Sequence, residues 1–211
     1  DLTAIEGDIY AGAYTDIFAS YTKTRKSYLG GLIGSTKISN TVDKYATGTQ
    51  ALAALDLTLV SGNDTTLIGA QLAAGGDLSI DTGGDFSVQA AISSQLSEYF
   101  EQKLGLVTMT TVTENSFREA AILSTFLTGG SLSFNVGGKA ELSVYDYAGI
   151  ASGDLNDLYP QELLAIAGLE LLAQNLADEY FYDKQVQLSP AFKALVAIAL
   201  NVVMPGSGVG G

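Results

Sequence analysis

Short runs of alternating apolar and polar residues, separated by small or polar turns, recur along most of the first 150 residues. In the two clearest stretches, 74–88 and 128–142, a Gly-Gly pair precedes a strand-length segment and recurs after eight positions. Within 74–88, Leu78 and Ile80 fall on one side and Ser79 on the other, which is the two-residue period of a half-buried strand. Each predicted strand therefore sends only two or three apolar side chains inward.

The two stretches are copies of each other at an offset of 54 residues, from Gly75 to Gly129. Such small apolar faces cannot close a core alone, so the strands must stack on equivalent strands above and below them. We therefore expect a mainly β fold, a right-handed parallel β-helix (solenoid), over residues 1–153.

Two segments, roughly 22–50 and 93–122, interrupt the repeats at the same place relative to the strands that follow. Both are rich in Thr, Ser, Val and Tyr, as in the segment 108–113. This composition favours β-hairpins that lie against the solenoid or project from it.

A small α-helical region is expected over 154–205. Pro160 can open a helix through residue 175, and Ser189-Pro190 can cap and open a second helix that ends before Pro205. The second helix is too short to span a bilayer, which needs about 20 residues. The glycines of 206–211 indicate a flexible linker.

Composition excludes several kinds of chemistry. The chain has no Cys and no His, which removes thiol nucleophiles, imidazole bases and the commonest zinc ligands. Its net charge of −13 disfavours a nucleic-acid partner. No glycine-rich phosphate loop or calcium nonapeptide occurs, so we expect no cofactor, no metal and no enzyme activity.

Five of the ten basic residues lie in the first interruption. They are Lys23, Arg25, Lys26, Lys37 and Lys44. They could contact an acidic partner or the phosphates of lipopolysaccharide; alternatively, they are solvated side chains that block edge pairing of a hairpin.

The segments 21–31, 61–72 and 74–77 resemble the haemagglutinin repeats of filamentous haemagglutinin exoproteins, and the resemblance covers about residues 1–150. The segment 181–191 is similar to the region that precedes the toxin in contact-dependent growth inhibition effectors of this family. The resemblance implies a virulence-type filament on the surface of a Gram-negative-type bacterium, secreted through an outer-membrane partner transporter. It further implies contact with a receptor or the outer membrane of a neighbouring cell, and delivery of a downstream toxin domain.

Three alternatives remain open at this stage. The first is a host-cell or matrix adhesin in which this segment is purely structural. The second is a membrane-active hairpin of the two helices, whose lipid or partner contacts would be Leu195, Val196, Ile198, Leu200, Val202 and Val203. The third is a β-helical polysaccharide-degrading enzyme using Asp64, Asp77, Asp81 and Asp85. Asp77 and Asp85 follow Gly-Gly pairs, however, where carboxylates commonly accept backbone N–H bonds.

Overall fold

The computed structural model describes residues 1–146 and 155–203, and places the side chains of 1–145 and 155–197. The chain divides into two compact units. One, the solenoid unit, is formed by 1–17, 44–94 and 118–177; the other, the sheet unit, by 18–43, 95–117 and the residues from 178 onward. Each is described by itself.

The solenoid unit is built from three sheets in which the paired strands run parallel. The first contains β1 (Leu2–Ala4), β6 (Leu57–Ser61), β9 (Leu78–Thr82) and β14 (Leu132–Val136). The second contains β2 (Ile9–Ala11), β7 (Thr65–Ile68), β10 (Phe86–Gln89), β15 (Ala140–Asp146) and β16 (Glu170–Asn175). The third contains β5 (Gln50–Ala53), β8 (Gln71–Ala74) and β13 (Thr125–Thr128). This confirms a mainly β, largely parallel fold, while the right-handed sense of its winding stays a prediction.

One turn of the solenoid takes 21 residues where no excursion interrupts it. Gln50 pairs with Gln71 in the third sheet, and their side-chain amides are hydrogen-bonded at 3.1 Å across that spacing. Gln71 pairs in turn with Thr125, 54 residues further on. The offset of the Gly-Gly repeats is therefore one turn of the solenoid plus one excursion.

The core is the stack of inward-facing side chains expected from the alternation. Leu78, Ile80, Phe86 and Val88 are buried, each at most 1% exposed. Burying an apolar side chain of this size stabilises the fold by about 1.5–3 kcal/mol. Phe134, in the next turn, packs on Phe86 with ring centroids 5.7 Å apart.

Both excursions leave the solenoid between its second and third sheets. In the uninterrupted turn, Gly69, with φ of 58°, joins β7 to β8 at this corner. In the turns before and after it, the same corner is replaced by the pair β3 (Tyr14–Tyr28) and β4 (Ile33–Thr47), and by β11 (Ala91–Leu104) and β12 (Thr108–Ile122). The two predicted hairpin excursions are thus confirmed, although the first begins at Tyr14 and not near residue 22.

The prediction of a helix over 161–175 is wrong for most of that range. Only α1 (Leu155–Leu158) and α2 (Gln161–Leu164) are helical, and β16 follows Gly168, whose φ of 74° ends the helical path. Residues 170–175 pair with 141–146 of β15, because backbone partners there outweigh helix propensity. The solenoid therefore continues beyond residue 154.

The short helices close one end of the core. Helix α2 packs against β14, and Tyr159 and Leu163 are buried in the main apolar cluster. The predicted boundary at 153–154 and the linker 206–211 lie outside the described residues. The second predicted helix is confirmed as α3 (Pro190–Val203).

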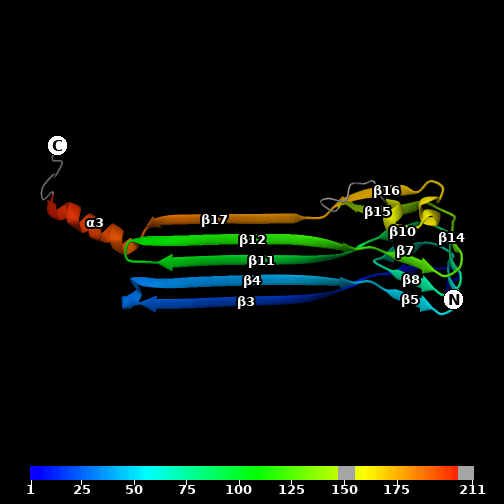
Figure 1. Cartoon of the computed structure of the whole chain (residues 1–211), viewed down its shortest axis with the longest axis horizontal. Helices are drawn as coiled ribbons and strands as arrows, with labels where there is room; N and C mark the ends of the chain where they lie inside the picture. The colour runs from blue at the N-terminus through cyan, green and yellow to red at the C-terminus, as the bar shows by residue number, and fades with distance from the viewer. Residues whose placement is uncertain (147–154, 204–211) are drawn as a thin grey trace. The chain divides into compact units, whose positions relative to one another are not determined.

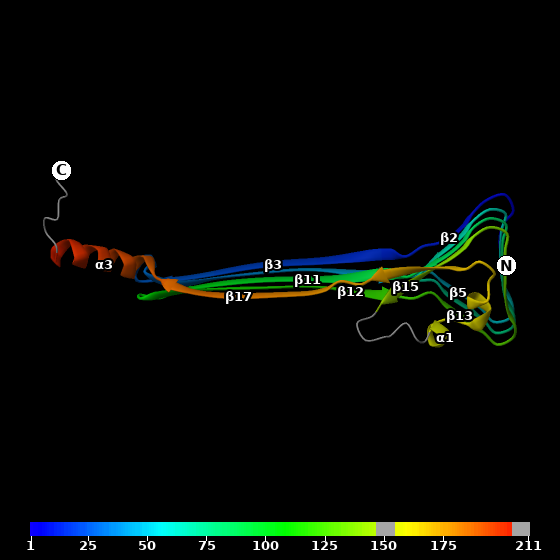
Figure 2. The same ribbon diagram turned by 90° about the horizontal axis from the view of Figure 1, so that it is seen from above.

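The sheet unit is one layer of five strands in the order β17-β12-β11-β4-β3, with β17 formed by Asp178–Leu188 (Figure 1). Neighbouring arrows point in opposite directions, so this sheet is antiparallel (Figure 1). Seen from above, the five strands overlie one another as a thin band (Figure 2). Both faces are therefore open to solvent over the described residues.

Candidate contact surface

Contacts between neighbouring strands fix the register of the five-stranded sheet. They are Ser20 Oγ with Thr41 Oγ1 (2.8 Å), Asn40 Nδ2 to Glu98 Oε2 (2.8 Å), Gly105 N–H to Thr108 O (2.8 Å) and Ser189 N–H to Val107 O (2.7 Å). Because side chains alternate along a strand, the register assigns each to one of two faces. We name these the Glu101 face and the Phe100 face.

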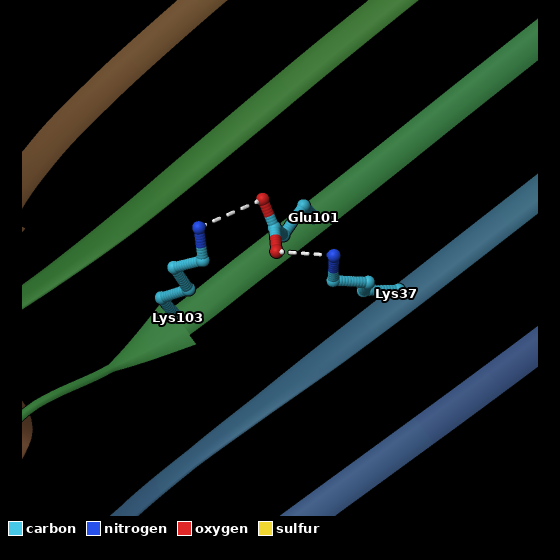
Figure 3. A network of polar contacts seen from close by, with 3 residues as sticks. All are labelled: Lys37, Glu101 and Lys103. Atoms are coloured by element: carbon cyan, nitrogen blue, oxygen red, sulfur yellow. Dashed lines mark ion pairs between the residues drawn. The ribbon is translucent and has the colours of Figure 1, made fainter.

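On the Glu101 face, one carboxylate holds two lysines from different strands. Glu101 Oε1 lies 3.1 Å from Lys37 Nζ of β4, and Oε2 lies 3.2 Å from Lys103 Nζ of its own strand (Figure 3). The Glu101 side chain is only 10% exposed. Burial by itself would raise the pKa of Glu101, but the two ammonium groups together lower it below its usual value. Hydrogen bonding to Glu101 raises the pKa of Lys37.

The five basic residues singled out from the sequence do not form one patch. Lys26 belongs with Lys37 on the Glu101 face, whereas Lys23 and Arg25 lie on the Phe100 face. Lys44 belongs to the solenoid unit. Alternation along β3 therefore separates neighbouring charges onto two faces, and a contact of any of these residues with an acidic partner stays a prediction.

A small hollow lies on the Phe100 face where Gly34 provides no side chain. It is lined by Arg25, Thr36, Gln102 and Leu104, among others. A Cβ on Gly34 would lie 2.5 Å from the carbonyl oxygen of Lys26, so the close approach of β3 and β4 requires glycine here. The hollow brings a guanidinium group beside polar side chains from two further strands.

The hairpin turns at one end of this sheet, together with the last residue of β17, carry exposed apolar side chains. We call them the turn cluster: Leu29, Leu32, Leu106, Val107 and Leu188. Their exposed fractions run from 47% for Leu188 to 66% for Leu29. Hairpin turns are normally polar, so apolar residues at these positions indicate a surface that contacts something else.

Helix α3 starts beside this cluster. Ser189 Oγ accepts the N–H of Phe192 at 3.1 Å as an N-cap and donates to Leu106 O at 2.5 Å. Leu195 and Val196 are exposed, as their candidate role requires. The side chains of Ile198, Leu200, Val202 and Val203 lie outside those described.

The pair of helices considered as membrane-active does not form, because α2 ends at Leu164 and β16 occupies the end of the predicted first helix. A lipid or partner contact of α3 by itself stays a prediction. Among the described residues, no helix has both the length and the apolar character needed to cross a membrane.

The four acids considered for catalysis have structural partners. Asp64 Oδ1 accepts the N–H of Asp85 at 2.8 Å, and Asp85 Oδ1 accepts that of Lys139 at 2.8 Å. Asp77 Oδ1 in the same way accepts the N–H of Ser131, and Asp81 accepts an amide N–H of Asn135. These hydrogen bonds from a carboxylate to a backbone N–H of the next turn form a carboxylate ladder, and they confirm the turn roles expected for Asp77 and Asp85. Within 1–146 and 155–203, no three acids gather as a metal site would need.

Sequence reasoning missed Glu101, Lys103 and the turn cluster. The apolar residues of Leu29-Gly-Gly-Leu32 and Gly105-Leu-Val107, at positions where turns are usually polar, were the available signal. The sequence held no signal for the ion pairs, because the register between two separate hairpins decides which lysine lies beside Glu101.

Stacked parallel strands, interrupted in the sequence by antiparallel strand pairs, define the class of this protein as a β-solenoid repeat protein. Residues 11–106 match the family model described as Hemagglutinin repeat, which confirms the resemblance to filamentous haemagglutinin-type proteins. The match covers somewhat less than half of the 211 residues and includes the whole first excursion. No curated protein and no solved structure matches the chain. A haemagglutinin repeat is typical of filamentous, adhesin-like proteins of two-partner secretion, which reach the cell surface through an outer-membrane transporter.

Proposed function

We propose that the chain is a contact segment of a secreted bacterial surface filament, and that the turn end of the five-stranded sheet binds the anionic surface of a neighbouring cell. The observation that carries this proposal is the turn cluster, an exposed apolar group at one end of a single-layer sheet. The solenoid unit serves as the scaffold that carries the hairpin arms.

The charge of the strands next to these turns supports an anionic target. Six basic residues lie in the turn-proximal parts of the five strands, against the two acids Glu101 and Asp183: they are Lys23, Arg25, Lys26, Lys37, Lys103 and Lys184. The whole chain, by contrast, carries −13. A local basic field steers association with anionic groups such as lipopolysaccharide phosphates, and within about 8 Å at physiological salt it escapes screening.

The apolar residues would supply the remaining binding energy. Fully burying one leucine is worth about 1.5–3 kcal/mol, so half-exposed leucines each offer about 1 kcal/mol on contact. This is weak for one segment, but repeated segments along a filament bind together with much higher avidity. Weak individual contacts are therefore compatible with firm attachment.

Binding of the purified chain to Gram-negative cells tests the proposal. We expect Leu29→Asp combined with Val107→Asp to lower binding about tenfold, because both apolar contacts are lost and negative charge is added. The matched control is Ile5→Asp with Leu55→Asp, which changes two apolar residues of the solenoid unit that are still more exposed than Leu29 and Val107. Equal loss in both variants, or none in the first, would contradict the proposed contact surface.

Toxin delivery into the neighbouring cell is the finer part of the proposal. Its support is the similarity of 181–191 to the pre-toxin region. Co-culture of target cells with cells making the full-length exoprotein, with and without residues 1–211, tests it by scoring killing and attachment separately. Loss of killing with attachment intact supports delivery; attachment only to host cells or matrix would instead favour a host adhesin.

A further inference from the structure

The five-stranded sheet has two open edges, β3 and β17. Every residue of β3 is exposed, as is every residue of β17 except Asp183, whereas most residues of the central strands are partly buried. In each of the two excursions, an outgoing strand (β3 or β11) is followed by a returning strand (β4 or β12). After β17, the chain forms α3 instead, and within the described residues no strand pairs with its outer edge.

The two edges carry opposite charge. Strand β3 holds Lys23, Arg25 and Lys26 against Asp16, while β17 holds three acids against Lys184. Like charges across a strand pair are destabilising, so two β3 edges or two β17 edges repel each other. The charges therefore favour pairing between the β3 edge of one chain and the β17 edge of another.

Strand direction and register agree with this combination. Both β3 and β17 are outgoing strands that point the same way (Figure 1). A second copy placed beside the first by translation would therefore bring its β17 alongside β3 in parallel. The contacts that fix the register place Lys23, Ile38, Phe100, Thr113 and Asp183 in one row across the Phe100 face.

We propose that β3 of one chain pairs with β17 of a second copy, with Lys23 opposite Asp183 and Tyr21 opposite Phe181. The backbone N–H and C=O groups of both edges supply the hydrogen bonds, and the ion pair and the aromatic pair select the register. The contact uses two different surfaces, so it leaves one of each free and can extend into an open lateral array.

Disulfide trapping tests the pairing, because the chain contains no other cysteine. A Lys23→Cys chain mixed with an Asp183→Cys chain should form a cross-linked dimer on mild oxidation, since neighbouring strands lie about 4.8 Å apart and a disulfide needs Cα atoms within about 7 Å. The matched control replaces Asp183→Cys with Lys184→Cys, whose side chain points to the opposite face. Equal cross-linking in both mixtures, or dimers formed by the Lys23→Cys chain alone, would overturn the proposal.

A charge exchange tests it without cysteines. In sedimentation velocity at low salt, the chain should associate with increasing concentration, and Lys23→Glu should weaken association about fivefold or more. Adding Asp183→Lys should restore it, whereas adding Lys184→Glu should not. A chain that stays monomeric at all concentrations would contradict the proposal, while cell binding through the turn cluster would be unaffected.

Discussion

The Gly-Gly turns of the solenoid offer a sharp test of why the repeat needs glycine. Asp56 Oδ1 accepts the N–H of Asp77 in the next turn at 2.9 Å. A Cβ placed on Gly76 would lie 2.2 Å from that same oxygen, while the nearest backbone atom, in Leu55, would be 3.4 Å away. The steric conflict of Gly76→Ala is therefore almost entirely with the Asp56 carboxylate, and Gly76 is not among the glycines with positive φ.

The magnitude follows from the bond that is lost. Gly76→Ala should displace the carboxylate and cost about 1.5–3 kcal/mol, the range for a hydrogen bond to a charged group. Asp56→Ala removes the same bond at a similar cost. In the double variant the methyl group occupies the vacated space, and Ala in place of Gly lowers the entropy of the unfolded chain by about 0.4–1 kcal/mol. The double variant should thus be no less stable than Asp56→Ala alone.

We would measure the stability of the two single variants and the double variant by urea unfolding, followed by far-UV circular dichroism. Hydrogen exchange of the Ile80 amide serves as a local probe. The control is Gly75→Ala, whose Cβ would lie 2.2 Å from the carbonyl oxygen of Ala54. That conflict is with backbone, so Asp56→Ala should not relieve it. Additive costs for Gly76→Ala and Asp56→Ala would refute the carboxylate ladder as the reason for glycine at this position.

Two further predictions concern other parts of the fold. The folded pKa of Glu101 lies below its ordinary value of 4.5, so its ion pairs should stabilise the sheet fully above that value and lose this effect as pH falls through the folded pKa. An NMR titration of Glu101 should give a pKa below the ordinary value. Unfolding measured between pH 2 and about 6 should show that Glu101→Gln removes the part of the stability that is lost in acid. Identical pH profiles of stability for the two chains would contradict the prediction. Leu163→Ala, at a fully buried site in α2, should cost about 2–4 kcal/mol in urea unfolding, whereas the exposed Leu171→Ala should cost less than about 0.5 kcal/mol. Similar losses in the two would show that α2 does not close the core.

The sequence predicted the parts of the fold that repeat. Gly75 and Gly129 mark equivalent turns, and the alternation around Ile80 identified the inward face, because period and burial are local properties of a strand. The strand β16 could not be predicted in the same way. Its apolar run Leu171-Leu172-Ala173 fits a helix as well as a strand, and only pairing with β15 decides between them.

The candidate site was predicted less completely than the fold. The basic residues of the first excursion were evident from composition, but their division between two faces depends on the strand boundaries of β3. The partnership of Lys37 with Glu101 depends on the register between β4 and β11, which the pattern of either strand alone does not specify.

We propose that the excursions contact the neighbouring cell and that the solenoid unit is only their scaffold. The uninterrupted corner at Gly69 supplies the design of the test. Joining Gly12 through one glycine to Thr49, and Gln89 through one glycine to Ser124, places a glycine at the Gly69 position and restores that corner in the other two turns.

This shortened chain should keep the circular dichroism and cooperative unfolding of a β-solenoid. Its binding to target cells should be measured beside that of the complete chain. We expect binding to fall to background when the excursions are removed. Binding that survives their removal would place the contact surface on the solenoid unit and contradict the proposed function.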